Sequence, residues 1–122
     1  MKVVVPAAML GVMLLALPAH AQRGVNLQAR TAGDLADLCA ANPKDPLGEA
    51  KINFCHGFAQ GAIIVEGRHT EGKKPFCFPS PAPSRTETMT QFVNWVRSMP
   101  DHKTPSAVDG LFQFLGERFP CK

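Results

Sequence analysis

Several common functional signatures are missing from this 122-residue sequence. It has no Cys-x-x-Cys pair and no glycine-rich phosphate loop, which argues against a zinc site and against a nucleotide site of the P-loop kind. No basic run exceeds Lys73-Lys74, so the sequence lacks the footprint of a nucleic-acid-binding protein. It also shows no alternating strand pattern of useful length and no internal repeat. A helical fold is expected.

The first 21 residues have the pattern of a secretory signal peptide. Met1-Lys2 is a short positive region, residues 3–17 are almost wholly apolar, and Ala19-His20-Ala21 is a small-x-small cleavage site. The apolar run is too short for a comfortable membrane span, and Pro6 interrupts it early. Export by a secretory pathway is expected, with no membrane span after cleavage. Residues 22–30 should form a flexible arm, and residues 31–122 one domain.

The first half of this domain contains two predicted helices. Thr31 and Asp34 have the spacing of a capping box, and they open a short helix that Asn42-Pro43 ends. A second, longer helix is expected from about Glu49 to Glu66. Gly67 is its predicted C-terminal stop.

The second half contains two more helices after an irregular connection. Residues 68–84 are polar and rich in proline, so they should run extended across the surface. Residues 84–87 have capping-box spacing and begin a third helix that ends near Met99-Pro100. Thr104-Pro105 supplies an N-cap and a first-turn proline for the fourth helix. Residues 120–122 end the chain.

The second helix is predicted to be the centre of the fold. Its apolar residues fill an arc of roughly 200°, wider than the stripe of an ordinary surface helix, which indicates packing on two sides. Gly57 and Gly61 lie near one edge of that arc and would let another helix come close. The opposite strip of Asn53, His56 and Gln60 is expected to be solvated.

The four cysteines behind an export signal predict two disulfides. Short links between the first and second helices, and between the third and fourth, favour two antiparallel hairpins. Of three possible pairings, an up-down-up-down order places Cys39 beside Cys55 at one end and Cys77 beside Cys121 at the other. The predicted fold class is therefore all-α, a small bundle of four or five helices stapled by two disulfides.

The sequence offers few groups for catalysis. Cys55 and His56 are adjacent, so on a helix they point about 100° apart, and Cys55 falls on the buried arc. His69 and His102 lie in predicted loops without metal-ligand spacing. No catalytic residue, no metal site and no cofactor are predicted, which leaves binding as the default function.

Three apolar residues do not fit the stripes of their helices. Phe114 lies about 100° from most of the apolar face of the fourth helix, and Trp95 and Met99 stand at the margin of the third. One interpretation is that they belong to the core, because each helix of a small bundle has two neighbours. The other is that they form a homo-oligomeric or partner surface, where aromatic side chains are common anchors.

An ordered set of short motifs resembles the Rap/Tai family of immunity proteins. The matching segments, in order, are Thr31-Ala32-Gly33-Asp34-Leu35 with Cys39, residues 54–61 (Phe-Cys-His-Gly-Phe-Ala-Gln-Gly), Cys77-Phe78-Pro79, Met99-Pro100 and Phe119-Pro120-Cys121. Residues 79–83 are richer in proline than this family pattern.

The resemblance implies a periplasmic, disulfide-bonded helical protein, often a homodimer, that neutralises a cell-wall amidase delivered by a type VI secretion system. It implies occlusion of the amidase groove by the connection between the last long helices, which here is Pro100, Asp101, His102, Lys103 and Thr104. Two alternatives remain at this point. One is a small periplasmic stress or chaperone-like helical protein, and the other is a structural component of the envelope.

Overall fold

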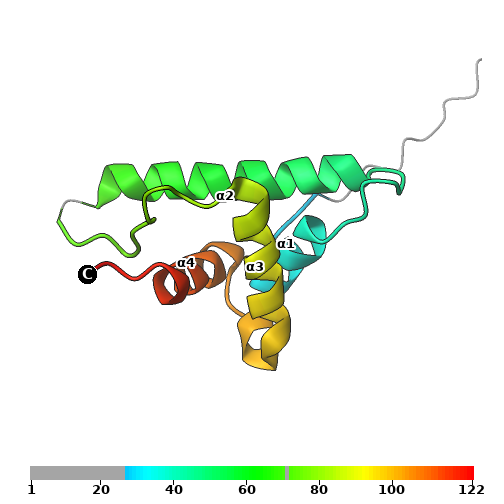
Figure 1. Cartoon of the computed structure of the whole chain (residues 1–122). Helices are drawn as coiled ribbons and strands as arrows, with labels where there is room; N and C mark the ends of the chain where they lie inside the picture. The colour runs from blue at the N-terminus through cyan, green and yellow to red at the C-terminus, as the bar shows by residue number, and fades with distance from the viewer. Residues whose placement is uncertain (1–26, 71) are drawn as a thin grey trace, which may run out of the picture.

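The computed structural model describes residues 27–70 and 72–122, and the predicted signal peptide lies outside these ranges, as do residues 22–26 of the predicted arm. The described residues form four α-helices and one 3-10 helix (Figure 1). They are α1 (Ala32–Cys39), α2 (Gly48–His69), α3 (Arg85–Ser98), η1 (Pro100–Lys103) and α4 (Ala107–Arg118). The all-α fold class is confirmed.

The shortest α-helix, α1, is the centre of the fold. It packs against α2, α3, η1 and α4. Its side chains Ala32, Leu35 and Ala36 are at most 1% exposed, although the helix has only eight residues. The prediction that the second helix is central was therefore wrong.

The start of α1 is fixed by a complete capping box, as predicted. The Thr31 hydroxyl accepts from the Asp34 backbone N–H at 3.1 Å, and the Asp34 carboxylate accepts from the Thr31 backbone N–H at 3.0 Å. The Arg30 backbone N–H donates to the same carboxylate. The Thr31 backbone bond, followed by the other bonds at this cap, lowers the pKa of Asp34 from its usual value.

Helix α2 lies along one side of the molecule (Figure 1). Only a narrow stripe that includes Cys55 and Ala59 is buried, whereas Ile64 and Val65 are about half exposed, at 49% and 56%. Apart from its chain neighbours and the backbone of α2 itself, no atom of the described residues would lie within 4 Å of a Cβ added at Gly57, and the same holds for Gly61. The predicted close approach of another helix at these glycines is not found, because α1 and α3 meet the opposite side of α2.

Both ends of α2 depend on local backbone geometry. It begins after Leu47, whose φ of 69° is left-handed. Gly48 follows, and a Cβ there would collide with the Asn42 carbonyl oxygen. The helix continues through Gly67 to His69, so the predicted stop at Gly67 was wrong. A glycine permits a helix end, but it does not prevent another helical turn.

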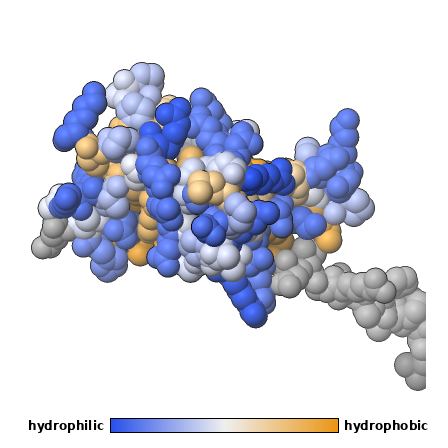
Figure 2. All heavy atoms as spheres, turned by 90° about the horizontal axis from the view of Figure 1, so that it is seen from below, coloured by the Kyte–Doolittle hydropathy of each residue, from blue (hydrophilic) through white to orange (hydrophobic). Residues whose placement is uncertain are grey.

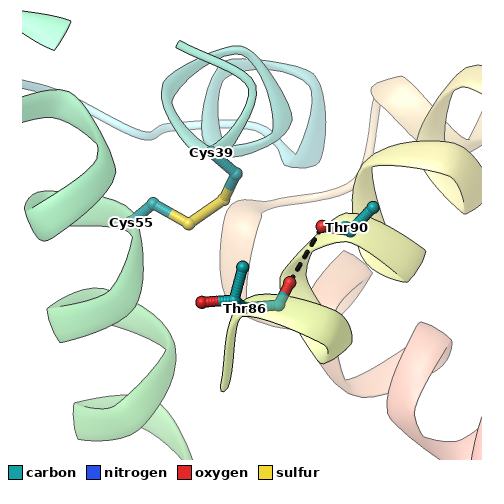
Figure 3. Close-up of a disulfide and its surroundings, with 4 residues drawn as sticks. All are labelled: Cys39, Cys55, Thr86 and Thr90. Carbon is teal, nitrogen blue, oxygen red and sulfur yellow. Dashed lines mark hydrogen bonds between the residues drawn. A yellow bond between two sulfur atoms is a disulfide. The ribbon is translucent and has the colours of Figure 1, made fainter. Parts of the chain in front are cut away.

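The two predicted disulfides are confirmed. Cys39 pairs with Cys55, and Cys77 pairs with Cys121. Figure 3 shows the first of these crossing from α1 to α2, with Thr86 of α3 nearby. The pairing is as predicted, but α3 and α4 do not form the predicted antiparallel hairpin, because α4 runs across the direction of α3 rather than back alongside it (Figure 1).

Helices α3 and α4 supply most of the remaining core, including Phe92, Leu111 and Leu115, which are all fully buried. Helix α4 begins at Ala107, and Ser106 is its N-cap, because the Ser106 hydroxyl accepts from the Asp109 backbone N–H at 3.2 Å. The predicted N-cap at Thr104-Pro105 was therefore two residues too early.

Candidate functional site

The link between α3 and α4 is the short helix η1, with Thr104 after it. Pro100 stands at its first position, where a missing backbone N–H is tolerated. The His102 N–H donates to the Met99 carbonyl at 3.1 Å, and the Thr104 hydroxyl donates to the Asp101 carbonyl at 3.1 Å. This segment, predicted to be a loop and by resemblance a contact element, is thus an internally bonded helical turn.

Most of this segment points into solvent. Pro100, Asp101, Lys103 and Thr104 are exposed, and His102 is half-buried. Met99, just before it, is 50% exposed. Figure 2 views the molecule from below, from the end at which η1 lies, and this face is mainly hydrophilic with narrow apolar strips. The exposed charged side chains of η1 are one acidic residue, Asp101, and one basic residue, Lys103.

Two rings hold η1 against α3. The His102 imidazole stacks on the Trp95 indole with ring centroids 3.7 Å apart and planes 8° apart. His102 Nδ1 also lies 2.7 Å from the Trp95 carbonyl oxygen. Trp95 Nε1 donates to a carboxylate oxygen of Glu117 on α4 at 2.7 Å.

The other side of η1 rests on the beginning of α1. The Ala32 N–H donates to the Pro105 carbonyl at 2.9 Å, and the Ala107 N–H donates to the Arg30 carbonyl at 3.0 Å. Gly33 faces the Lys103 carbonyl so closely that an added Cβ would lie 3.3 Å from its oxygen. The segment is therefore fixed from both sides.

The structure gives different degrees of burial to Phe114 and Trp95, the two aromatic residues that lie outside the apolar stripes of their helices. Phe114 is only 2% exposed and packs against Phe92, Trp95 and Phe119. Phe114 is thus a core residue, and its prediction as a partner-binding residue was wrong, because α4 buries this side against α3. Trp95 is half-buried beside η1. Met99, which the sequence placed at a margin, is exposed next to the same segment.

The Cys55-His56 pair noted in the sequence is not a reactive pair. Cys55 is in a disulfide, so it is not a nucleophile for the neighbouring His56. Within residues 27–70 and 72–122, no group of three or more His, Cys, Asp or Glu side chains could hold a metal ion.

Among the described residues, no helix has the combined length and apolar character needed to cross a membrane.

The comparisons with known proteins agree with the motif resemblance. A family model described as Rap1a immunity proteins matches residues 31–121. No curated protein and no solved structure matches the chain. The match covers all four α-helices, η1 and both disulfides. The family implies immunity to a type VI secretion effector and a role without enzymatic activity. The chain belongs to the Rap1a family of immunity proteins.

Proposed function

We propose that this protein binds a peptidoglycan amidase effector of a type VI secretion system and inhibits it by placing η1 in the active-site groove. The observation that carries the proposal is an exposed helical turn that stacks on α3 through His102 and is followed at once by backbone hydrogen bonds, at Pro105 and Ala107, to the beginning of α1. A segment that is already ordered loses little conformational freedom when it binds, so more of its contact energy appears as affinity.

The side chains and hydrogen bonds of η1 suit a segment that enters a groove on another protein. Asp101 and Lys103 can pair with charged groups at the rim of a groove, which favours specificity and a fast encounter. Pro100 and the internal hydrogen bonds of η1 limit its flexibility. The family role is non-enzymatic, so inhibition would be stoichiometric.

We place this activity in the bacterial periplasm. Both disulfides require an oxidising compartment to form and persist. The apolar N-terminal pattern that ends at Ala21 supplies the expected export signal. The amidase would meet the protein in the compartment that contains its cell-wall substrate.

We also propose that the protein forms a homodimer through the outer side of α2. Ile64 and Val65 are about half exposed there, and the open space beside Gly57 and Gly61 leaves room for a second helix. Val65→Lys should convert the dimer into a monomer in light scattering at equal protein concentration. A wild-type monomer at micromolar concentration would contradict this part of the proposal.

Inhibition of candidate type VI secretion amidase effectors by the purified protein tests the main proposal. Peptidoglycan hydrolysis should stop at one molar equivalent of the wild-type protein. Lys103→Glu should weaken inhibition at least tenfold, because it reverses a charge at the contact. Lys44→Glu is the matched control, since Lys44 is also exposed but lies in the turn before α2. Full hydrolysis with excess wild-type protein would refute immunity, and equal inhibition by both variants would refute the role of η1.

A different result would favour the chaperone-like alternative. In that case the protein would suppress aggregation of several unrelated unfolded proteins, most strongly after acidification, and it would not retain the amidase in a pull-down. The partly exposed apolar residues of α2 are the feature that this alternative would use.

A further inference from the structure

We propose that Trp95 and His102 are positioning residues, which hold η1 in its binding shape while its exposed side chains meet the effector. The inference rests on the proposed function and deepens it. It also changes the role expected for Trp95, which the sequence suggested as a direct partner contact.

The first step concerns the hydrogen bond between His102 and α3. The Trp95 carbonyl lies in the last turn of α3, where carbonyl groups have no helical N–H partner. A carbonyl oxygen only accepts, so the His102 nitrogen 2.7 Å away must be the donor, which places a proton on Nδ1. The Ser98 hydroxyl donates to the same oxygen at 2.6 Å. His102 therefore caps α3 from within η1.

The second step concerns the indole itself. One face of the Trp95 ring is covered by the His102 imidazole at 3.7 Å. Its Nε1–H is bonded to Glu117, which also accepts from Gln113 at 3.1 Å. Phe114 packs beside the ring with centroids 6.0 Å apart. The indole cannot turn toward a partner without breaking its bond to α4.

These contacts form one continuous connection from α4 to η1. Glu117 and Gln113 hold the indole edge, the indole holds the imidazole, and the imidazole belongs to η1. Loosening this connection would release several backbone residues that binding must then order again. We expect about tenfold weaker binding from that loss alone, even though the contacting side chains remain unchanged.

The free protein provides the first test, because Trp95 is the only tryptophan in the sequence. His102→Ala should uncover the indole, with red-shifted emission and stronger quenching by acrylamide. Amide hydrogen exchange at residues 101–104 should accelerate in the same variant. His102→Phe keeps a stacking ring and should restore most of the protection. Lys103→Ala, one residue further along, is the matched control and should change neither signal.

Affinity for the amidase provides the second test. His102→Ala should bind about tenfold more weakly than the wild type, and His102→Phe should recover most of the loss. Lys103→Ala should weaken binding without changing Trp95 fluorescence, as expected for a direct contact.

Three results would overturn the inference. One is unchanged indole protection and exchange in His102→Ala. Another is a loosened η1 with unchanged affinity. The third is weaker binding by both His102→Ala and His102→Phe while the free segment stays ordered, which would make His102 a contact. If the wild type binds no amidase, the proposed function fails, and the fluorescence and exchange measurements alone decide whether the rings hold η1.

Discussion

Gly110 lies where α4 crosses the beginning of α1, and its replacement by alanine gives a direct test of the packing. A Cβ at Gly110 would overlap the Cβ of Ala32, which is 0% exposed. Ala32 has little freedom to move, because its N–H is bonded to the Pro105 carbonyl at 2.9 Å. The added methyl group must therefore push α1 and α4 apart.

Two opposing effects determine the size of the change. Overpacking a well-packed contact costs about 1–3 kcal/mol. Replacing glycine by alanine inside a helix returns up to about 1 kcal/mol through helix propensity. We expect Gly110→Ala to lower the free energy of unfolding by about 1–2 kcal/mol. In a domain of this size, each kcal/mol lost lowers Tm by about 4–8 °C.

Urea unfolding followed by far-ultraviolet circular dichroism measures this difference, and Gly67→Ala is the matched control. Gly67 is also a helical glycine, but it is exposed, and apart from its chain neighbours and the backbone of its own helix no atom lies within 4 Å of the added Cβ. Its replacement should stabilise the protein by about 0.5–1 kcal/mol. The changes in the free energy of unfolding should therefore have opposite signs. A Gly110→Ala protein as stable as Gly67→Ala would refute the close approach of α1 and α4.

Three further predictions concern covalent and local interactions. Replacing Cys77 and Cys121 together by alanine should lower the free energy of unfolding by roughly 4 kcal/mol on the loop-entropy model, as measured by urea unfolding; a loss below about 1 kcal/mol would contradict it. Leu47→Asn should raise Tm slightly, because asparagine tolerates a φ of 69° better than leucine does, and a lower Tm would contradict this reason. The pKa of Asp34 is lowered in the folded state, so its stabilising effect is present above the ordinary aspartate pKa and is lost as the pH falls through the folded value. Asp34→Asn should reduce the acid dependence of stability in unfolding curves measured from neutral pH to about pH 2, and an unchanged dependence would argue against the cap at Thr31.

Local signals in the sequence were sufficient for the number and order of the helices, although they misplaced the end of α2 and the start of α4. The capping pair Thr31 and Asp34, and the proline after Met99, act within a few residues, so their consequences are visible without the fold. The disulfide pairing was predicted from the up-down-up-down order of the helices. The short link between the first two helices brings Cys39 beside Cys55, whereas Cys77 and Cys121 were paired because each follows a helix expected to end on the same side.

The relative positions of the helices were harder to predict. A wide apolar arc indicates that a helix has much apolar surface, but it does not indicate how much of that surface a neighbour covers. Helix α2 therefore seemed central, whereas α1, with its small side chains Ala32 and Ala36, is the helix that the others surround. The burial of Phe114 likewise depends on how α3 and α4 cross. The spacing of residues along one helix gives no information about that crossing.

The role of the link between α3 and α4 was suggested by resemblance, whereas its rigidity was not predicted. Trp95 and His102 are seven residues apart, so on one continuous α-helix they would share a face but lie about 10 Å apart along the axis, too far to stack. Their stacking requires the chain to turn back at Pro100. The partner bond to Glu117 depends on α4, so only the complete fold reveals it.

The small side chains at the centre have a consequence for how this protein can change over evolutionary time. Substitutions near Ala32 and Gly110 are strongly constrained, because there is no spare volume between α1 and α4. Asp101, Lys103 and Thr104 are exposed, so they can be exchanged at little cost to folding. A few substitutions at these exposed positions could therefore adapt the protein to a new toxin while the residues of the core stay the same.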